Sequence, residues 1–480
     1  MSRHRGLQLE SHKAQPFEQP LLVAPPPRVA TMALDQGSGE EAEAVVEPGH
    51  SVRVGTVIAL GRGAAAGLHS PVSGIVRDIG LRPTVRGTGR CIVIESDGHD
   101  EREAGMAPLD WRAKDSTALL ECIGAAGVAG LGGAAFPTAA KLELARSTGA
   151  ELLLLNGAEC EPWICCDDAL LREQSAAVVL GAQVMLAACG ARHCIIAVED
   201  DKPQAIASLE SALSSAGDAR LEVTVLPAVF PLGAEGPLVA AVTGREVPHD
   251  GLPPQVGVVC QNVGTAAAVA RLVCEGLPVV SRIVTVTGSG ILRPANVQAH
   301  IGTPLADLVA ACGGYLGSQH TLIAGGSLTG RALTSDAVPV TKGLNCLLVA
   351  TPADLPARGA EMPCIRCGDC AGVCPAGLLP QQLHVAAQAD DAAALTRFGL
   401  AACIECGCCD YVCPSAIPLT ARFRAARERQ QLRERERRRA TDARARHERH
   451  QRRLHEQAAA ERQAFDEARR RARDVDQTGD

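Results

Sequence analysis

Eight cysteines in the last quarter of the sequence form two words of identical spacing. The first word is Cys364-x2-Cys367-x2-Cys370-x3-Cys374-Pro375, and the second is Cys403-x2-Cys406-x2-Cys409-x3-Cys413-Pro414, 39 residues later. Thiolates at these spacings hold [4Fe–4S] clusters, and the fourth cysteine of each word serves the other cluster. The chemistry is one-electron transfer, and the expected ligand sets are Cys364, Cys367, Cys370 with Cys413, and Cys403, Cys406, Cys409 with Cys374.

Two other interpretations of these cysteines are less favoured. Structural zinc sites usually pair two C-x2-C knuckles across a longer loop, and disulfide frameworks belong to short secreted chains. Cys408 checks the register, because the matching position in the first word is Asp369. Asp369 could not serve the same ligand role, so we expect Cys408 to lie beside the ligands without being one.

The composition is that of a large globular protein. At 480 residues the chain is long enough for three or four domains. Hydrophobic residues make up 46% of the chain but aromatic residues only 2%, so we expect cores built from Ala, Val, Leu and Ile. The twelve cysteines outside the two words are irregularly spaced, which favours a reducing compartment where free cysteine behaves as a small apolar residue.

The sequence predicts neither a signal peptide nor a membrane span. The start, MSRHRGLQLESHKAQ, lacks an apolar core, and no uncharged apolar run reaches about 18 residues. We therefore expect a cytoplasmic chain whose contact with a membrane is peripheral.

The net charge of −7 is unevenly distributed along the chain. Residues 421–480 hold 19 Arg against 12 acidic residues and few apolar ones. Such a segment cannot bury a core of its own, although Glu–Arg pairs at helical spacing support a helix weakly. We expect an Arg-rich, helical or disordered tail, suited to anionic lipid or an acidic partner.

Strands and turns dominate the first part of the chain. After an N-terminal extension at 1–39, residues 40–110 alternate short strands with turns such as Pro48-Gly49. This pattern resembles the barrel-sandwich hybrid fold of biotinyl and lipoyl carrier domains. Those carriers need a lysine at a hairpin tip, whereas no lysine occurs between Lys13 and Lys114. A structural role is therefore expected.

Two further regions precede the cysteine words. Residues 111–278 alternate short apolar runs with helix-length segments, which favours a Rossmann-like parallel sheet covered by helices on both faces. Residues 279–352 combine a strand pair, a helix and further strands, which indicates a small α+β module of β-grasp type. A linker rich in Pro and Ala then opens the cysteine segment at 353–420.

Chemically useful residues cluster around the apolar runs of the expected parallel sheet. A glycine-rich stretch holds Gly130, Gly132 and Gly133, with Lys141 close behind. Backbone N–H groups in such a loop can approach a phosphate or a flat ring, and lysine adds a positive charge. Because ligands gather beyond the carboxyl ends of parallel strands, we expect the site there. The stretch matches neither G-x-G-x-x-G nor the P-loop pattern.

Order and motifs together resemble the RnfC family, a component of the Rnf ion-translocating electron transport complex that is related to the NADH-binding flavoprotein subunit of respiratory complex I. The resemblance covers roughly residues 5–420 and rests on GLGGAAFPTAAK, NGAECEP, FPLGAEGPL, QNVGT and the two cysteine words. It implies a multidomain α/β and α+β chain: a barrel-sandwich hybrid segment, a flavoprotein domain, a soluble-ligand-binding β-grasp (SLBB) module and a ferredoxin-type segment with two [4Fe–4S] clusters.

The resemblance also implies roles for individual residues. FMN would lie on Gly130, Gly132, Gly133 and Lys141, with Phe136 near the nicotinamide ring. The remaining candidates are Asn156 and Glu159 near the flavin, Glu161 near NADH, Asn262 and Thr265 as a second flavin contact, and Gly233 and Glu235 in the loop over the nucleotide. Glu159, Glu161, Asp167 and Asp168 could equally be an acidic cluster favoured by a helix start.

One departure from the family pattern concerns the nucleotide loop. Family members usually have Tyr-Pro-x-Gly-Gly-Glu-Lys-Gln-Leu, whereas this chain has Phe230, Ala234, Gly236 and Pro237 at the changed positions. The lysine and the tyrosyl hydroxyl are lost, which puts nucleotide affinity or specificity in doubt.

The expected function is that of the NADH- and FMN-handling iron–sulfur subunit of a membrane-bound ferredoxin:NAD+ oxidoreductase coupled to ion translocation. A flavin would connect a two-electron hydride donor with one-electron clusters, and no side chain needs to act as an acid or base. Partners would be the other Rnf subunits, on the cytoplasmic side of the cell membrane. Alternatives are a soluble homologue such as cobalamin reductase of microcompartments, or an iron–sulfur relay with a vestigial nucleotide site.

Overall fold

The computed structural model describes residues 6–248, 251–355 and 359–477, with side chains up to residue 470. The ends of the expected N-terminal extension and tail, and part of the linker at 353–361, lie outside these residues. The chain forms two compact units, one of residues 1–381 and 402–419 and one of residues 382–401 and 420–480. Among the described helices, none has both the length and the apolar composition needed to span a bilayer.

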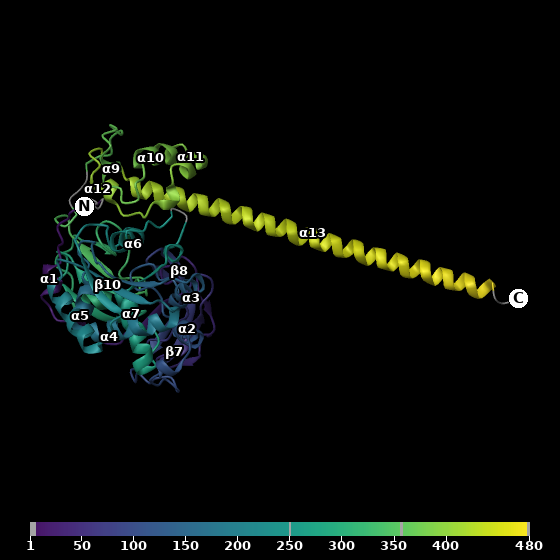
Figure 1. Ribbon diagram of the computed structural model, residues 1–480, viewed down its shortest axis with the longest axis horizontal. Helices are drawn as coiled ribbons and strands as arrows, with labels where there is room; N and C mark the ends of the chain where they lie inside the picture. Colours follow the sequence, from purple (N-terminus) through teal and green to yellow (C-terminus); the bar gives the residue numbers. More distant parts are fainter. Residues whose placement is uncertain (1–5, 249–250, 356–358, 478–480) are drawn as a thin grey trace. The chain divides into compact units, whose positions relative to one another are not determined.

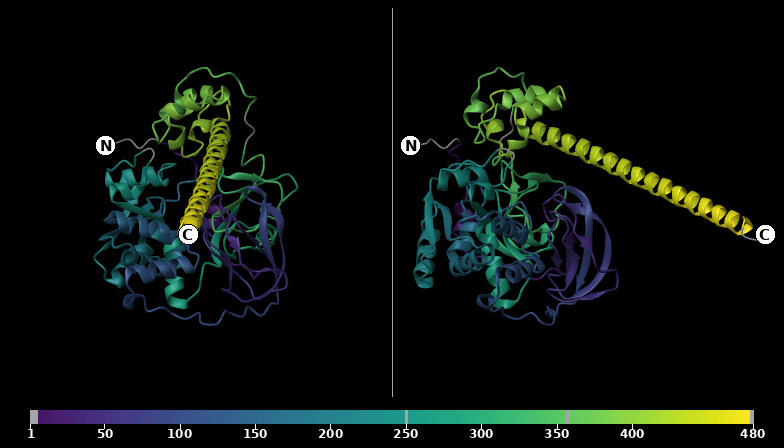
Figure 2. Two further views of the ribbon diagram at one scale, coloured as in Figure 1. Left: turned by 90° about the vertical axis from the view of Figure 1, so that its right-hand side faces the viewer. Right: turned by 45° about the vertical axis from the view of Figure 1, so that its right-hand side comes forward.

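Two small sheets form the first body of the larger unit, drawn in purple to blue in Figure 2. One has the order β2-β8-β7-β4 and the other β3-β5-β6. Their bounds are β2 Val29–Ala33, β3 Glu43–Ala44, β4 Ser51–Val52, β5 Val57–Leu60, β6 Leu68–His69, β7 Gly74–Thr84 and β8 Gly87–Ser96. Apolar side chains such as Ile58, Leu68 and Ile92 are fully buried between them. The barrel-sandwich type of fold is confirmed.

The segment expected as an N-terminal extension contributes to two sheets. β2 pairs antiparallel with β8, and β1 (Leu22–Val23) pairs in parallel with β14 (Ala295–His300) of a later domain. The short helix α1 spans Ala14–Phe17. The structure thus differs from a separate extension at 1–39, because its short strands acquire partners only from distant parts of the chain.

The parallel sheet is present, and its strands end where the apolar runs end. Its order is β11-β10-β9-β12, with β9 at Leu152–Gly157, β10 at His193–Glu199, β11 at Leu221–Leu226 and β12 at Val258–Asn262. The surrounding helices are α2 Ser116–Ala125, α3 Thr138–Thr148, α4 Cys166–Cys189, α5 Pro203–Ala216, α6 Glu235–Thr243 and α7 Val263–Glu275 (Figure 1).

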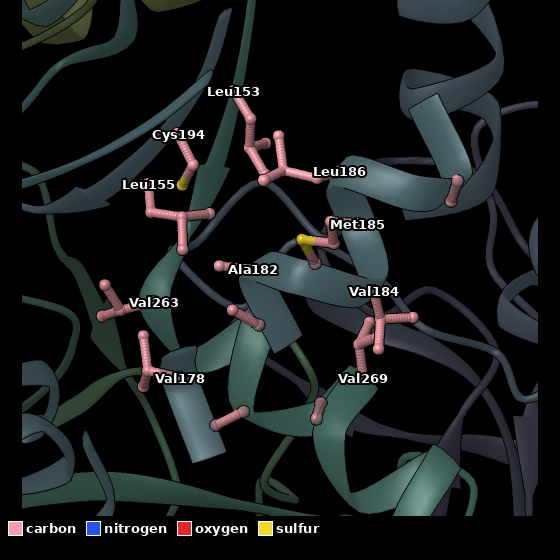
Figure 3. Packing of buried hydrophobic residues seen from close by; sticks show 14 of the residues in the cluster. Leu153, Leu155, Val178, Ala182, Val184, Met185, Leu186, Cys194, Val263 and Val269 are labelled. Atoms are coloured by element: carbon pink, nitrogen blue, oxygen red, sulfur yellow. The ribbon is translucent and has the colours of Figure 1, made fainter. Parts of the chain in front are cut away.

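Small and branched apolar residues build the core of this domain. Leu153 and Leu155 of β9 face Val178, Ala182 and Met185 of α4, and Val263 and Val269 of α7 lie alongside (Figure 3). Helices α4 and α7 approach so closely that a Cβ at Gly181 would lie 1.9 Å from the Ala266 carbonyl oxygen. The expectation of an aliphatic core is therefore met here.

A six-stranded mixed sheet follows, with the order β1-β14-β13-β17-β15-β16. Its later strands are β13 Ser281–Thr287, β15 Thr321–Ala324, β16 Arg331–Leu333 and β17 Cys346–Ala350, and α8 spans Leu305–Ala311. Val284, Val286 and Leu347 are fully buried against residues of the barrel-sandwich sheets, because both belong to one hydrophobic cluster.

Short helices follow the two cysteine words at matching positions. α9 (Asp369–Gly372) and α12 (Cys408–Tyr411) are 39 residues apart, as are the first residues of α10 (Pro380–Gln388) and α13 (Leu419–Gln477). α11 spans Ala392–Arg397. The internal repeat therefore continues beyond the cysteines.

The tail is a single helix of 59 residues, α13 (Figure 1). Its first turns differ from a fully solvated tail, because Phe423 and Ala426 are each 1% exposed. Within the smaller unit, Arg429 and Arg433 of this helix pair with Asp390. Leu432, Leu454 and Phe465 farther along are exposed.

Candidate functional site

The parallel sheet reverses its strand order between β9 and β12. From β9 the chain proceeds to β10 and β11 on one side, while β12 pairs with β9 on the other. Asn156 and Asn262 are register partners at the carboxyl ends of these two strands. Such a switch point is where open α/β sheets bind their ligands.

A cavity of about 390 Å³ opens at this switch point. Its wall includes Gly132 and Gly133 of the glycine-rich loop, both asparagines, and residues from the barrel-sandwich hairpin and the six-stranded sheet. Cys406, from the second cysteine word, also lines it. The cavity therefore brings the predicted flavin loop and a predicted cluster ligand together within the larger unit.

The glycine-rich loop is held by its own backbone and by one buried threonine. Gly130 N–H donates to the Phe136 carbonyl at 2.9 Å, and Ala135 N–H donates to the Gly130 carbonyl at 3.0 Å. Thr265, fully buried, accepts from Leu131 N–H at 3.0 Å through Oγ1. Thr265 thus anchors the loop and does not line the cavity, while the Phe136 side chain is 42% exposed outside it.

On the cavity side of this loop, the absence of side chains leaves room for a ligand. A Cβ at Gly133 would meet no atom within 4 Å, and the residue has φ +117°, a value that favours glycine. At Gly132 a Cβ would lie 3.2 Å from the Asn262 side chain. Both positions suit the close approach of a flat ring or a phosphate to the backbone.

Glu159 caps the start of α4. Its carboxylate accepts the backbone N–H of Asp167 at 3.0 Å and that of Asp168 at 3.3 Å. These are first-turn donors, for which helices provide no internal acceptor. The helix-start interpretation of this glutamate therefore describes its contacts, although Glu159 also lines the cavity.

Glu161 is hydrogen-bonded to a loop of the six-stranded-sheet domain. Its carboxylate accepts the backbone N–H groups of Leu328 and Thr329 at 2.9 Å, and the Thr329 hydroxyl at 2.6 Å. Burial raises the pKa of Glu161 above its ordinary value, and these hydrogen bonds oppose that rise. Glu161 therefore joins two domains at the cavity wall.

The altered nucleotide loop packs directly on the acidic loop. Asn156 Nδ2 donates to the Gly233 carbonyl at 2.8 Å, and Gly233 N–H donates to Cys160 Sγ at 3.3 Å. A Cβ at Gly233 would lie 2.2 Å from the Ala158 carbonyl oxygen, so glycine is required. Beyond it, Glu235 forms an ion pair with Lys141. Neither Lys141 nor Glu235 lines the cavity.

Asp167 is the carboxyl group most altered by its surroundings. Its side chain accepts from Asn262 Nδ2 at 2.6 Å. Burial, and after it the negative charge of Glu159, raises the pKa of Asp167 to about 7. The ligand atoms of Glu159, Cys166 and Asp167 lie within 4.8 Å of one another, which explains their electrostatic interaction.

A segment near the N-terminus covers the acidic loop. His12 stacks on Trp163 with ring centroids 4.4 Å apart, Trp163 N–H donates to Ser11, and Lys13 Nζ donates to the Glu159 carbonyl. Leu7 forms a bridge with Phe230 of the altered loop. The sequence analysis did not anticipate this segment, because its residues match no motif and meet the site only in the fold.

The two cysteine words have the same backbone conformation. The residue before the second cysteine is left-handed in each, at Arg366 (φ 58°) and Glu405 (φ 54°), and so is the glycine after it, at Gly368 and Gly407. Left-handed positions so close together curl a loop so that its backbone N–H groups can face an anionic group. The loops therefore fit iron–sulfur clusters in conformation as well as in spacing.

Contacts between the words agree with the crossed ligand sets. Met362 N–H donates to the Ser415 carbonyl at 2.9 Å, and Ser415 Oγ donates to the Pro363 carbonyl at 3.0 Å. These bonds join the residues just before Cys364 to those just after Cys413. The crossed sets require this approach, because they assign those two cysteines to one cluster.

Cys408 is fully buried beside the second set of cysteines. A hydrogen bond with Cys406, then burial, then the charges of Cys406, Cys409 and Cys374 raise its pKa. The same hydrogen bond lowers the pKa of Cys406. Cys374 of the first word thus acts on the surroundings of the second word, as the crossed sets require.

The structure brings together seven of the twelve predicted cofactor-binding residues at the cavity: Gly132, Gly133, Asn156, Glu159, Glu161, Gly233 and Asn262. It places Gly130, Phe136, Lys141, Glu235 and Thr265 around the supporting loops. Cavity residues that the sequence analysis missed include Asp35, Arg86 and Arg331. Only the position of Arg86 at a hairpin tip could have drawn attention to it.

Comparisons with known families account for most of the chain. Four family models match it: the RnfC barrel sandwich hybrid domain at residues 1–99, the Nuo51 FMN-binding domain at 123–271, the SLBB domain at 283–332 and the 4Fe-4S dicluster domain at 359–439. The last match extends beyond the boundary expected at residue 420, into the first turns of α13.

Similar proteins share one name, that of the RnfC component of the ion-translocating oxidoreductase complex. The protein of this name from Pseudomonas aeruginosa is 44% identical over 95% of this chain, which spans 60% of that relative's length. The one from Rhodobacter capsulatus is 38% identical over 88% of this chain and 82% of its own. A solved chain of an NAD+-reducing [NiFe]-hydrogenase aligns at 23% identity with a TM-score of 0.47, over 67% of this chain and 62% of its own. The chain belongs to the RnfC family of the ion-translocating oxidoreductase complex.

Proposed function

We propose that the chain is the NADH- and FMN-handling iron–sulfur subunit of an Rnf-type ferredoxin:NAD+ oxidoreductase coupled to ion translocation. It would associate peripherally, through the other Rnf subunits, with the cytoplasmic side of the cell membrane. One observation carries the proposal: the cavity at the strand switch point is lined both by the glycine-rich loop and by Cys406. A ligand held there would lie beside a residue expected to hold a cluster.

Chain residues fit FMN in this cavity. Gly132 and Gly133 leave the backbone open on the ligand side, and Asn156 and Asn262 lie at the two strand ends. Bound FMN would accept electrons as a pair from NADH and release them singly, which one-electron clusters require. The residues themselves bind and orient, and Asp167 holds a proton near neutral pH.

The eight word cysteines would hold two [4Fe–4S] clusters in the crossed sets, so each word would bind both. Cys406 would connect the FMN cavity with the cluster of the second word. Direct transfer from this cavity to a cluster supports the electron-transfer subunit over the vestigial-site alternative. The loss of the lysine in the Phe230–Pro237 loop is the feature that favours that alternative.

An anaerobic absorption spectrum with and without NADH tests the proposal. Reconstituted protein should contain about eight irons per chain and bind FMN, and NADH should bleach the flavin and cluster absorption together. The protein without added FMN is the control, in which NADH should leave the clusters oxidised. Clusters that stay oxidised in the presence of both FMN and NADH would contradict the assignment.

A further inference from the structure

A hairpin of the barrel-sandwich region forms part of the cavity wall. β7 and β8 are joined through Val85 and Arg86, and the tip residues Thr84, Val85 and Arg86 all line the cavity that holds Gly132 and Gly133. The parallel-sheet domain therefore does not enclose its ligand alone. A domain earlier in the chain contributes to the same site.

The charges around the cavity would oppose an anionic ligand without this hairpin. Four carboxyl side chains line the cavity: those of Asp35, Glu159, Glu161 and Asp167. The basic side chains among the described lining residues are Arg86 and Arg331. Lys141, the cation expected from the sequence, is paired with Glu235 outside the lining. A phosphate bound here therefore needs a cation that the parallel-sheet domain does not supply.

The Arg86 side chain is held in place but retains donors. Its Nη2 donates to the Gly37 carbonyl at 3.0 Å, and its Nε lies 3.7 Å from Asp35 Oδ2. Asp35 is itself fixed, because its Oδ1 accepts from Gly37 and Gly39 N–H groups. The side chain of Arg86 is 47% exposed. Guanidinium has five N–H donors in a planar fork that matches phosphate oxygens.

We propose that Arg86 binds a phosphate group of the nucleotide in this cavity and thereby replaces the lysine that the Phe230–Pro237 loop lacks. The inference rests on the proposed function, because it assumes that a nucleotide occupies the cavity. The phosphate chemistry is common to two occupants, the monophosphate of FMN and the diphosphate of NADH. Asp35 is the positioning residue that orients the guanidinium.

Binding measurements on the full-length, anaerobically reconstituted protein test this role. Arg86→Gln should raise the Kd of FMN or of NADH about tenfold to a hundredfold, the effect of losing a charge-assisted hydrogen bond. Arg86→Lys should recover part of the loss, because it restores the charge without the fork. Arg77→Gln is the matched control: Arg77 lies on β7, is similarly exposed, pairs with Glu95 and does not line the cavity.

Riboflavin distinguishes the two sources of phosphate. If Arg86→Gln weakens FMN binding and leaves riboflavin binding unchanged, Arg86 binds the flavin phosphate. If FMN binding is unchanged and NADH binding weakens, Arg86 binds the diphosphate. Unchanged Kd values for both nucleotides, or an equal loss in Arg77→Gln, would overturn the inference while leaving the proposed function intact. A wild-type protein that binds neither nucleotide would overturn both.

Discussion

At the scale of single residues, the acidic side chains around the cavity mainly bind other parts of the protein. Glu159 caps α4, Glu161 accepts from the loop at 328–329, and Glu235 pairs with Lys141. Their carboxylates are thereby fixed before any ligand arrives. Asp167 differs, because its environment disfavours the charged form and holds a proton near neutral pH.

Asp167 should make stability depend on pH. Its pKa is raised from 3.8 to about 7 in the folded protein, so the folded state binds more protons than the unfolded state between those values. The contribution of Asp167 is therefore fully present below about pH 4 and is lost as the pH rises through 7. Asp167→Asn should raise the melting temperature relative to wild type more at pH 8 than at pH 5, measured on FMN-free protein.

Asp218→Asn provides the control for this measurement. Hydrogen bonds from Arg220 hold the pKa of Asp218 well below its usual range, so its stabilisation is complete at both pH 5 and pH 8. The shift in melting temperature caused by Asp218→Asn should be the same at the two pH values. Equal shifts for Asp167→Asn at the two pH values would show that Asp167 is ionised normally.

At the scale of elements, the cysteine segment is a repeat that continues into the tail helix. α9 corresponds to α12, and the first residue of α10 corresponds to that of α13. His384 and Ala387 of α10 are buried, as are Phe423 and Ala426 at the matching positions of α13. The first turns of the long helix are therefore the second copy of α10, and the Arg-rich remainder extends from it.

Pairs of cysteine substitutions test the crossing of the two words. If Cys374 and Cys403 hold the same cluster, the double variant Cys374→Ser/Cys403→Ser should keep the other cluster and contain about four irons. Cys364→Ser/Cys374→Ser should lose both clusters. Iron and sulfide are determined after anaerobic reconstitution, and near-complete loss of iron from the first double variant would contradict the crossed sets.

Cys408→Ser is the matched control for these variants. Cys408 is buried like the ligands and lies beside Cys406, so it tests whether removal of any thiol in this loop releases iron. The Cys408→Ser protein should keep about eight irons. A loss of half the iron in this variant would make Cys408 a ligand.

At the scale of the larger unit, one buried lysine connects three domains. Lys342, in the domain of the six-stranded sheet, donates through Nζ to the Gly67 carbonyl of the barrel-sandwich region and the Gly127 carbonyl of the flavoprotein domain, both at 2.7 Å. The side chain is fully buried, and burial lowers its pKa to about 7. The two carbonyl groups offset the cost of burying the ammonium.

Lys342→Met should destabilise the packing of these domains. The substitution leaves two buried carbonyl groups without this donor, at a cost of about 1–3 kcal/mol each. Differential scanning fluorimetry should show a lower melting temperature than wild type. Limited proteolysis should also cut faster between the domains. Lys114→Met, at a partly exposed lysine, is the control, and equal melting temperatures for the two variants would contradict the connecting role.

The sequence by itself determined the features that depend on neighbouring residues. Cysteine spacing within a word is local because three ligands of a cluster come from one loop, and the apolar runs ending at Asn156, Glu199 and Asn262 predicted the ends of β9, β10 and β12. The family resemblance placed FMN-binding and iron–sulfur domains in the correct order, and the family matches confirm it.

Only the tertiary structure decided which side chains complete the site. Lys13 reaches Glu159 across 146 residues and Lys342 reaches Gly67 across 275, while Arg86 comes to the cavity from another domain. None of these residues stands in a motif, because a basic side chain becomes meaningful only through the groups that face it. The sequence marked Lys141 as the cation of the site, but the fold pairs it with Glu235 and brings Arg86 to the cavity instead.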